Sequence, residues 1–215
     1  MLSESAAVPP GPAPRGRARG RRAVCPPAVV QLWAALHTAG TARDRQLGSS
    51  YAGRMRSNEI FARMSTERAV AFLEEVKREA RPVAQIALGA AAQAFRLRPE
   101  FLRRQPKQRQ AEWMRKALGR TVGAPLAEEL LATYFLEHHL DLLKEWLDLI
   151  GIEHEEGQIQ SESLEAPAPD VLRGAVEQFR KGDQPERREL LLLAFAAQSA
   201  VDWPELESLL GVSPA

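Results

Sequence analysis

The sequence predicts an all-α protein, either a single helical bundle or an irregular orthogonal array of about 6–8 helices, preceded by a disordered N-terminal tail. Three observations support this prediction. Apolar residues recur at intervals of three and four from residue 65 onward, which is the period of amphipathic helices. Prolines fall mostly between the periodic segments, where helices begin. Only GQIQ, residues 157–160, suggests an extended piece.

Residues 1–54 differ in composition from the rest of the chain. The stretch VPPGPAPRGRARGRRAVCPP is rich in Pro, Gly, Ala and Arg and has no helical period. We expect it to be disordered, because it cannot bury enough apolar surface to offset the entropy lost on ordering. Two alternatives stay open. In the first, the segment is an export signal, although its apolar part AVVQLWAAL is short and follows two prolines. In the second, residues 1–54 result from a translation start assigned too early, ahead of Met55 or Met64.

An all-helical globular domain is expected over residues 57–215. Its first clear helix covers residues 65–80, where Ala69, Phe72, Leu73 and Val76 share one face and Ser65 can cap the N-terminus. The next helix, residues 82–95, begins at a proline and is rich in Ala, with a glycine at position 89. Small side chains permit a close approach between helices, so we place this helix inside the bundle.

The following part of the chain, residues 96–120, is strongly basic and is called the basic segment below. A short helical turn lies between two prolines at residues 98–106, and a helix covers residues 107–119. Only Glu100 and Glu112 oppose the basic side chains. Together with the aromatic Trp113, eight of the basic residues form the predicted contact surface: Arg96, Arg98, Arg103, Arg104, Lys107, Arg109, Arg115 and Lys116.

The longest predicted helix, residues 125–150, begins at a proline and ends at a glycine. It is expected to pack against residues 82–95 and 189–201. Acidic residues dominate from residue 128 to residue 165, the acidic segment, which includes a loop at about residues 151–168. Three further helices are predicted at residues 169–182, 185–201 and 203–211.

Three of the four histidines lie in FLEHHLDLLKEWLDLIGIEHEEG, residues 135–157. His138, His139, Asp141 and His154 form a weak polar cluster in the sequence. Adjacent helical residues point about 100° apart, so His138 and His139 are poorly placed to share an ion. We therefore expect no metal here. Instead, His139 should pack at the edge of the core and donate to a carbonyl, and His138 should pair with Asp141 or Glu145 at the surface.

The composition excludes several classes of protein. A net charge of +1 provides no whole-molecule attraction to nucleic acid or to an anionic membrane. The single cysteine, Cys25, excludes an intramolecular disulfide framework and a cysteine-based zinc site, and it fits a reducing compartment. No apolar run reaches the roughly 18 residues of a spanning helix. We expect a cytoplasmic protein without a membrane span.

The charge asymmetry has three interpretations. In the first, the two charged segments face each other or simply solvate the bundle. In the second, they dock other proteins. In the third, the basic segment binds nucleic acid, with Phe101 or Trp113 stacking on an unpaired base. No phosphate-binding loop, nucleophile elbow or H-E-x-x-H motif is present. The prediction is a non-catalytic interaction or regulatory module with no catalytic residue, cofactor or metal. It uses the basic face, residues 96–120, and the acidic face, residues 128–165, to bind another protein, and nucleic-acid binding through the basic segment is the alternative.

Overall fold

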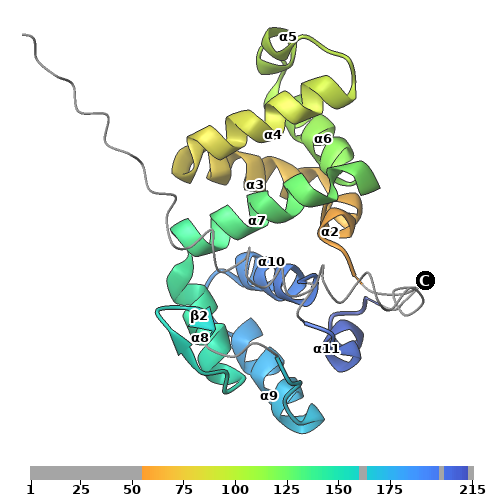
Figure 1. The fold of residues 1–215 in the computed structure, drawn as a ribbon. Coiled ribbons are helices and arrows are strands. Elements are labelled where there is room, and N and C mark those ends of the chain that lie inside the picture. Colours follow the sequence, from red (N-terminus) through yellow and green to blue (C-terminus); the bar gives the residue numbers. More distant parts are fainter. Residues whose placement is uncertain (1–54, 160–163, 199–200, 213–215) are drawn as a thin grey trace, which may run out of the picture.

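The computed structural model describes residues 55–159, 164–198 and 201–212. These residues form an all-α fold, as the sequence predicts, with one short β-hairpin (Figure 1). The disordered tail, the export signal and the misassigned start were predicted for residues 1–54, which lie outside the described residues. In the part of the chain that is described, no helix combines the length and apolar character needed to cross a bilayer.

The described residues contain ten α-helices, and their order along the chain also includes one 3-10 helix, η1, and two strands. The elements are α2 (Ser57–Arg63), α3 (Thr66–Glu79), α4 (Arg81–Ala94), α5 (Pro99–Arg103), α6 (Lys107–Leu118), η1 (Thr121–Gly123), α7 (Ala124–His138), α8 (Leu140–Leu149), β1 (His154–Glu155), β2 (Gln158–Ile159), α9 (Pro169–Arg180), α10 (Pro185–Ala196) and α11 (Pro204–Leu209). The number exceeds the prediction because α2 was not foreseen and because the longest predicted helix is divided in two.

Helices α2 to α7 form the N-terminal half of the fold. In Figure 1, α4 and α6 lie beside α3, and α7 crosses below them. The Ser65 hydroxyl accepts from the Arg68 amide at 3.1 Å and so caps α3, as predicted. Gly89 does not mediate the close approach expected for residues 82–95, because a Cβ added there would meet no atom within 4 Å. Alanines of α4, including Ala84 and Ala91, form the buried contact surface instead.

The predicted helix at residues 125–150 is not continuous. The backbone leaves the helical region at His139, with φ −136° and ψ 37°, where α7 ends and α8 begins. No proline or glycine causes the break. The apolar residues on its two sides pack against partly different neighbours: α7 contacts α2, α4 and α10, whereas α8 places Trp146 against Phe179 of α9 and Phe195 of α10, at ring separations of 5.4 and 5.9 Å.

The predicted acidic loop contains the hairpin formed by β1 and β2, in which His154 pairs with Ile159. Glu156 and Gly157 turn the chain with φ values of 50° and 79°, which is the conformation of a tight hairpin turn. The extended character expected for GQIQ is therefore confirmed at Gln158–Ile159.

Helices α8 to α11 form the C-terminal half. The Arg188 side chain is buried and donates to both carboxylate oxygens of Glu145, at 2.6 and 2.8 Å, while its guanidinium lies 4.6 Å from the Phe179 ring centroid. This one side chain therefore links α8, α9 and α10. The two halves meet where α2 and α7 contact α10.

Candidate functional site

Four side chains of the basic segment form ion pairs with nearby carboxylates. Lys107 pairs with Glu74 of α3, and Lys116 pairs with Glu112 at 2.7 Å. Arg109 lies 3.6 Å from the same Glu112, and Arg103 lies 3.7 Å from Glu100. Hydrogen bonding to Lys107 and Lys116 lowers the pKa of Glu74 and of Glu112, respectively. Of these pairs, that of Lys107 joins α6 to α3, and the other three lie within α5 or α6.

Two other basic residues of this segment contact backbone or an aromatic ring. Arg115 donates to the carbonyl oxygens of Ala62 and Met64, at 3.3 and 3.1 Å, and so binds the end of α2. The guanidinium of Arg120 lies 4.7 Å from the Phe95 ring centroid. Trp113 also packs on Phe95, with ring centroids 5.3 Å apart, and is half-buried. Trp113 is thus part of the packing between α4 and α6 and is poorly placed to stack on a base.

A small group around α5 remains unneutralised. Arg96, Arg98 and Arg104 are exposed and form no ion pair with any residue that the structure describes. Phe101, on α5 between Arg98 and Arg104 in the sequence, exposes 49% of its surface. We call these four residues the α5 patch. An exposed aromatic side chain close in sequence to arginines without ion pairs is a feature expected of a binding surface.

The three histidines of residues 135–157 do not converge. His154 Nε2 lies 3.2 Å from Asp148 Oδ1, and its Nδ1 accepts from the Gly157 amide at 3.2 Å, so this ring fastens the hairpin to α8. His138 ends α7, and the described residues include no ion pair between it and Asp141 or Glu145. Glu145 pairs with Arg188 instead, so the predicted surface pairing of His138 is wrong.

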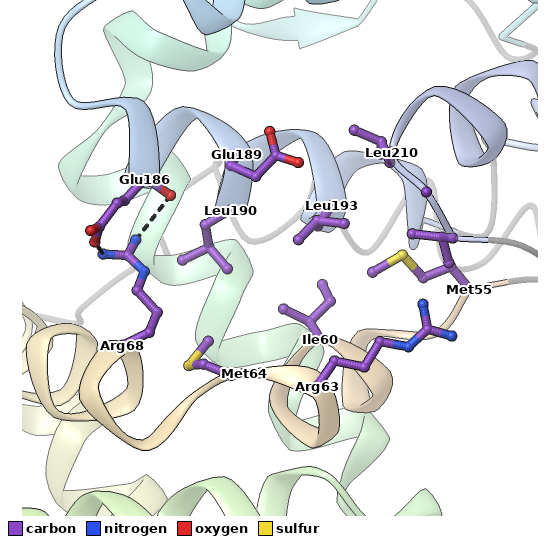
Figure 2. A pocket seen from close by; sticks show the side chains of 12 residues that line it. Met55, Ile60, Arg63, Met64, Arg68, Glu186, Glu189, Leu190, Leu193 and Leu210 are labelled. Carbon is purple, nitrogen blue, oxygen red and sulfur yellow. Dashed lines mark hydrogen bonds and ion pairs between the residues drawn. The ribbon is translucent and has the colours of Figure 1, made fainter.

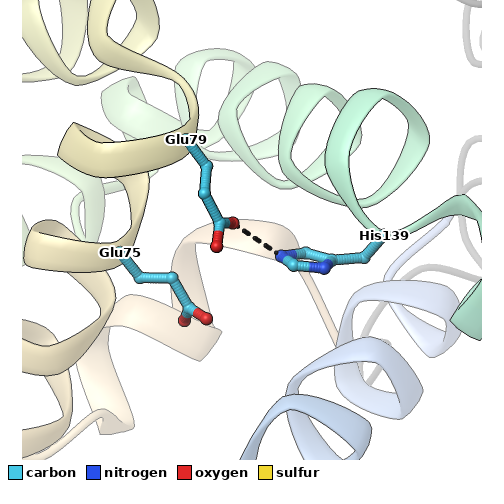
Figure 3. A group of neighbouring side chains, drawn as sticks. All are labelled: Glu75, Glu79 and His139. Atoms are coloured by element: carbon cyan, nitrogen blue, oxygen red, sulfur yellow. Dashed lines mark ion pairs between the residues drawn. The ribbon is translucent and has the colours of Figure 1, made fainter.

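His139 has a different environment, because the helix break turns it toward α3. Its Nε2 lies 3.0 Å from Glu79 Oε2, and Glu75 lies one turn earlier on the same helix (Figure 3). Donor atoms of Glu75, Glu79 and His139 all lie within 4.8 Å of one another. We call these three residues the junction cluster. Among the described residues His139 donates to no carbonyl, so that prediction is wrong: the ring faces the Glu79 carboxylate.

Arginines and a tyrosine surround the junction cluster. Arg78 donates to Glu79 Oε1 at 3.1 Å, and Arg187 of α10 forms an ion pair with Glu75 Oε1. Arg187 also donates from Nε to the Tyr134 hydroxyl at 3.0 Å. The His139 ring packs edge-on against the Tyr134 ring, with centroids 4.5 Å apart. The cluster thus joins α3, α10 and the break between α7 and α8.

Burial determines the protonation of the rings in this region. Burial lowers the pKa of His139, although the Glu79 carboxylate opposes this effect, so the imidazole is neutral near pH 7. Burial, reinforced by the negative charge of Glu79, raises the pKa of Tyr134. A neutral imidazole beside two carboxylates can act as a metal ligand or as a proton acceptor.

Sequence reasoning missed this cluster. The available signal was the four-residue spacing of Glu75 and Glu79, which places both carboxylates on one side of a helix. That spacing is common on exposed helices, and nothing in the sequence indicated that the chain breaks at His139.

An apolar pocket of about 410 Å³ lies between α2, the start of α3, α10 and the end of α11 (Figure 2). Its apolar lining includes Ile60, Met64, Leu190 and Leu193, and the ion pair of Arg68 with Glu186 lies at one side. The size is within the range of ligand pockets. We assign it no function, because the lining also includes Met55 and Val212, the two ends of the described chain.

Comparison with known proteins identifies no relative: no protein-family model, curated protein sequence or solved structure matches this chain. The α5 patch and the junction cluster are therefore the two candidate functional sites in the described part of the chain.

Proposed function

We propose that the protein is a non-catalytic interaction module that binds an acidic segment of another protein through the α5 patch. One observation carries this proposal. Most of the basic segment is neutralised or packed, whereas Arg96, Arg98 and Arg104 remain free of ion pairs within the described residues and lie close in sequence to the half-exposed Phe101. Carboxylates of a partner would pair with the arginines, and an apolar side chain would cover the ring.

Nucleic-acid binding is the second candidate function, and it has weaker support. Phosphate binding draws its affinity from several free cations along a surface, and Lys107, Arg109 and Lys116 are already paired with carboxylates. Base stacking would depend on Phe101, because Trp113 packs against Phe95.

We also propose that the protein acts in the cytoplasm. The presence of a single cysteine, Cys25, supports this compartment, because disulfides are rare there.

The test has two steps. A photo-crosslinking residue is placed at position 101 in the full chain, and the same residue at position 122 is the control, because Val122 is 86% exposed and lies on η1. We expect a partner protein to be captured in cells from position 101 and not from position 122. Capture that depends on RNA or DNA would favour nucleic-acid binding instead.

The purified partner is then titrated against two matched variants. Arg98→Glu combined with Arg104→Glu reverses two free charges, whereas Arg109→Glu combined with Lys116→Glu reverses two charges that are already paired with Glu112. We expect the first variant to weaken binding about tenfold or more, and the second to change it about threefold or less. Equal losses would contradict the proposed role of the α5 patch.

A further inference from the structure

We propose that Glu75, Glu79 and His139 bind a first-row divalent transition-metal ion, with Zn²⁺ as the first ion to test. This site is separate from the α5 patch and does not depend on it. The ligand set is two carboxylates and one imidazole. Such mixed oxygen and nitrogen ligands suit Zn²⁺ and Mn²⁺, whereas an imidazole ligand does not suit Mg²⁺ or Ca²⁺.

The geometry of the cluster is close to what a metal ion requires. Bonds of about 2.1 Å place the ligand atoms of a tetrahedral site about 3.4 Å apart. The donor atoms here lie within 4.8 Å of one another, and the Glu79 and His139 atoms are already 3.0 Å apart. Small rotations of the two glutamate side chains would complete the site. The two glutamates lie on a regular helix. The His139 amide donates a hydrogen bond to the Phe135 carbonyl oxygen, which fixes the backbone at His139.

A second observation also points to a ligand. The His139 side chain is nine-tenths buried, with 10% of its surface exposed. Its Nε2 and Glu79 Oε2 are close, yet they are not aligned as a hydrogen bond, and neither atom has a hydrogen-bond partner elsewhere in the described chain. Buried polar atoms are normally satisfied. A cation bound between the two atoms would satisfy both.

The neighbouring arginines contact Oε1 of both glutamates, whereas His139 faces Oε2 of Glu79. Arg78 and Arg187 contact Oε1 of Glu75, and Arg78 contacts Oε1 of Glu79. These contacts resemble the outer hydrogen bonds that orient carboxylate ligands in metal sites. The arginines also compete with the ion for the same negative charge. We therefore expect binding weaker than that of a closed four-ligand structural zinc site.

Metal binding would fasten α3 to the break between α7 and α8. Because a ligand that binds only the folded state stabilises it, Zn²⁺ should raise the melting temperature. The experiment uses the tag-free full-length chain, stripped with a chelator and then titrated with Zn²⁺ by calorimetry. We expect one equivalent to bind and the melting temperature to rise. Mg²⁺ should produce neither effect.

Four substitutions and one spectrum make the assignment specific. His139→Gln and Glu79→Gln should each weaken Zn²⁺ binding about tenfold or more. His154→Gln removes another histidine that lies next to a carboxylate and should leave binding unchanged. Cys25→Ser serves as the control for a thiol ligand. Co²⁺ bound to the unaltered chain should give visible absorption of a low-symmetry site, which does not depend on any variant folding.

Two results would overturn the proposal. One is the absence of stoichiometric Zn²⁺ binding by the unaltered chain. The other is binding that survives in a folded His139→Gln variant, as judged by circular dichroism. In either case the junction cluster would be an ion-pair network that only fixes the helix break.

Discussion

At the residue scale, Tyr134 shows how the core accommodates a polar group. The side chain is completely buried and packs edge-on against Phe72 and Phe135, at ring separations of 5.1 and 5.0 Å. Its hydroxyl accepts a hydrogen bond from Arg187. Ionisation would place a phenolate in this apolar environment near Glu79, and the pKa of Tyr134 is raised above its ordinary value of 10.0 for that reason.

This shift predicts a specific alkaline behaviour. Tyr51 is the only other tyrosine, so Tyr51→Phe leaves Tyr134 as the sole source of phenolate absorbance. In the unfolded chain Tyr134 should ionise near pH 10, whereas in the folded chain it stays neutral, so stability should fall as pH rises above about 10. We expect absorbance at 295 nm to rise together with the loss of far-UV circular dichroism. A rise near pH 10 in the folded protein would contradict the raised pKa.

At the element scale, two glycines have opposite roles. Gly123 lies where η1 meets α7, and a Cβ there would be 2.5 Å from the Ala117 carbonyl oxygen and 3.0 Å from Leu118 Cα. These are backbone atoms, which cannot move aside as a side chain can. Gly89 lies within α4, where a Cβ would meet nothing within 4 Å. One position therefore requires glycine, and the other gains nothing from it.

Alanine substitutions should separate the two cases. Gly123→Ala should lower the free energy of unfolding by about 1–3 kcal/mol, because η1 must move away from the end of α6. Gly89→Ala should raise it by about 0.5–1 kcal/mol, because alanine is the better helix former. Urea denaturation at pH 7 measures both. A loss of stability in Gly89→Ala would mean that α4 needs the glycine after all.

The elements also show where sequence reasoning succeeds. The predicted helices at residues 82–95, 107–119 and 169–182 match α4, α6 and α9 closely, because their ends carry local signals such as Pro82, Gly119 and Pro169. The break at His139 carries no such local signal, and the helices on its two sides have partly different packing neighbours. The junction cluster was missed for the same reason, since it exists only because that break turns His139 toward α3.

At the scale of the whole molecule, two of the ion pairs between described residues link the halves, and they differ in burial. Arg187 of α10 pairs with Glu75 of α3, and these side chains expose only 17% and 14% of their surface. Arg68 of α3 pairs with Glu186 of α10 at 2.5 Å, but Glu186 is 71% exposed. Removing one partner of a buried pair leaves an uncompensated charge, whereas water can replace an exposed partner.

We therefore expect unequal effects from two matched substitutions. Arg187→Met should lower the free energy of unfolding by about 3–5 kcal/mol, because Glu75 is left buried without its strongest partner and the Tyr134 hydroxyl loses a donor. Arg68→Met should cost about 1 kcal/mol or less. Adding Glu75→Gln to Arg187→Met should recover part of the loss, since it removes the unpaired charge. Equal losses in the two single variants, measured by urea denaturation, would show that the buried pair does not hold the halves together. The rescue by Glu75→Gln is the stricter measurement, because it separates the electrostatic effect from the loss of arginine packing between α10 and α3.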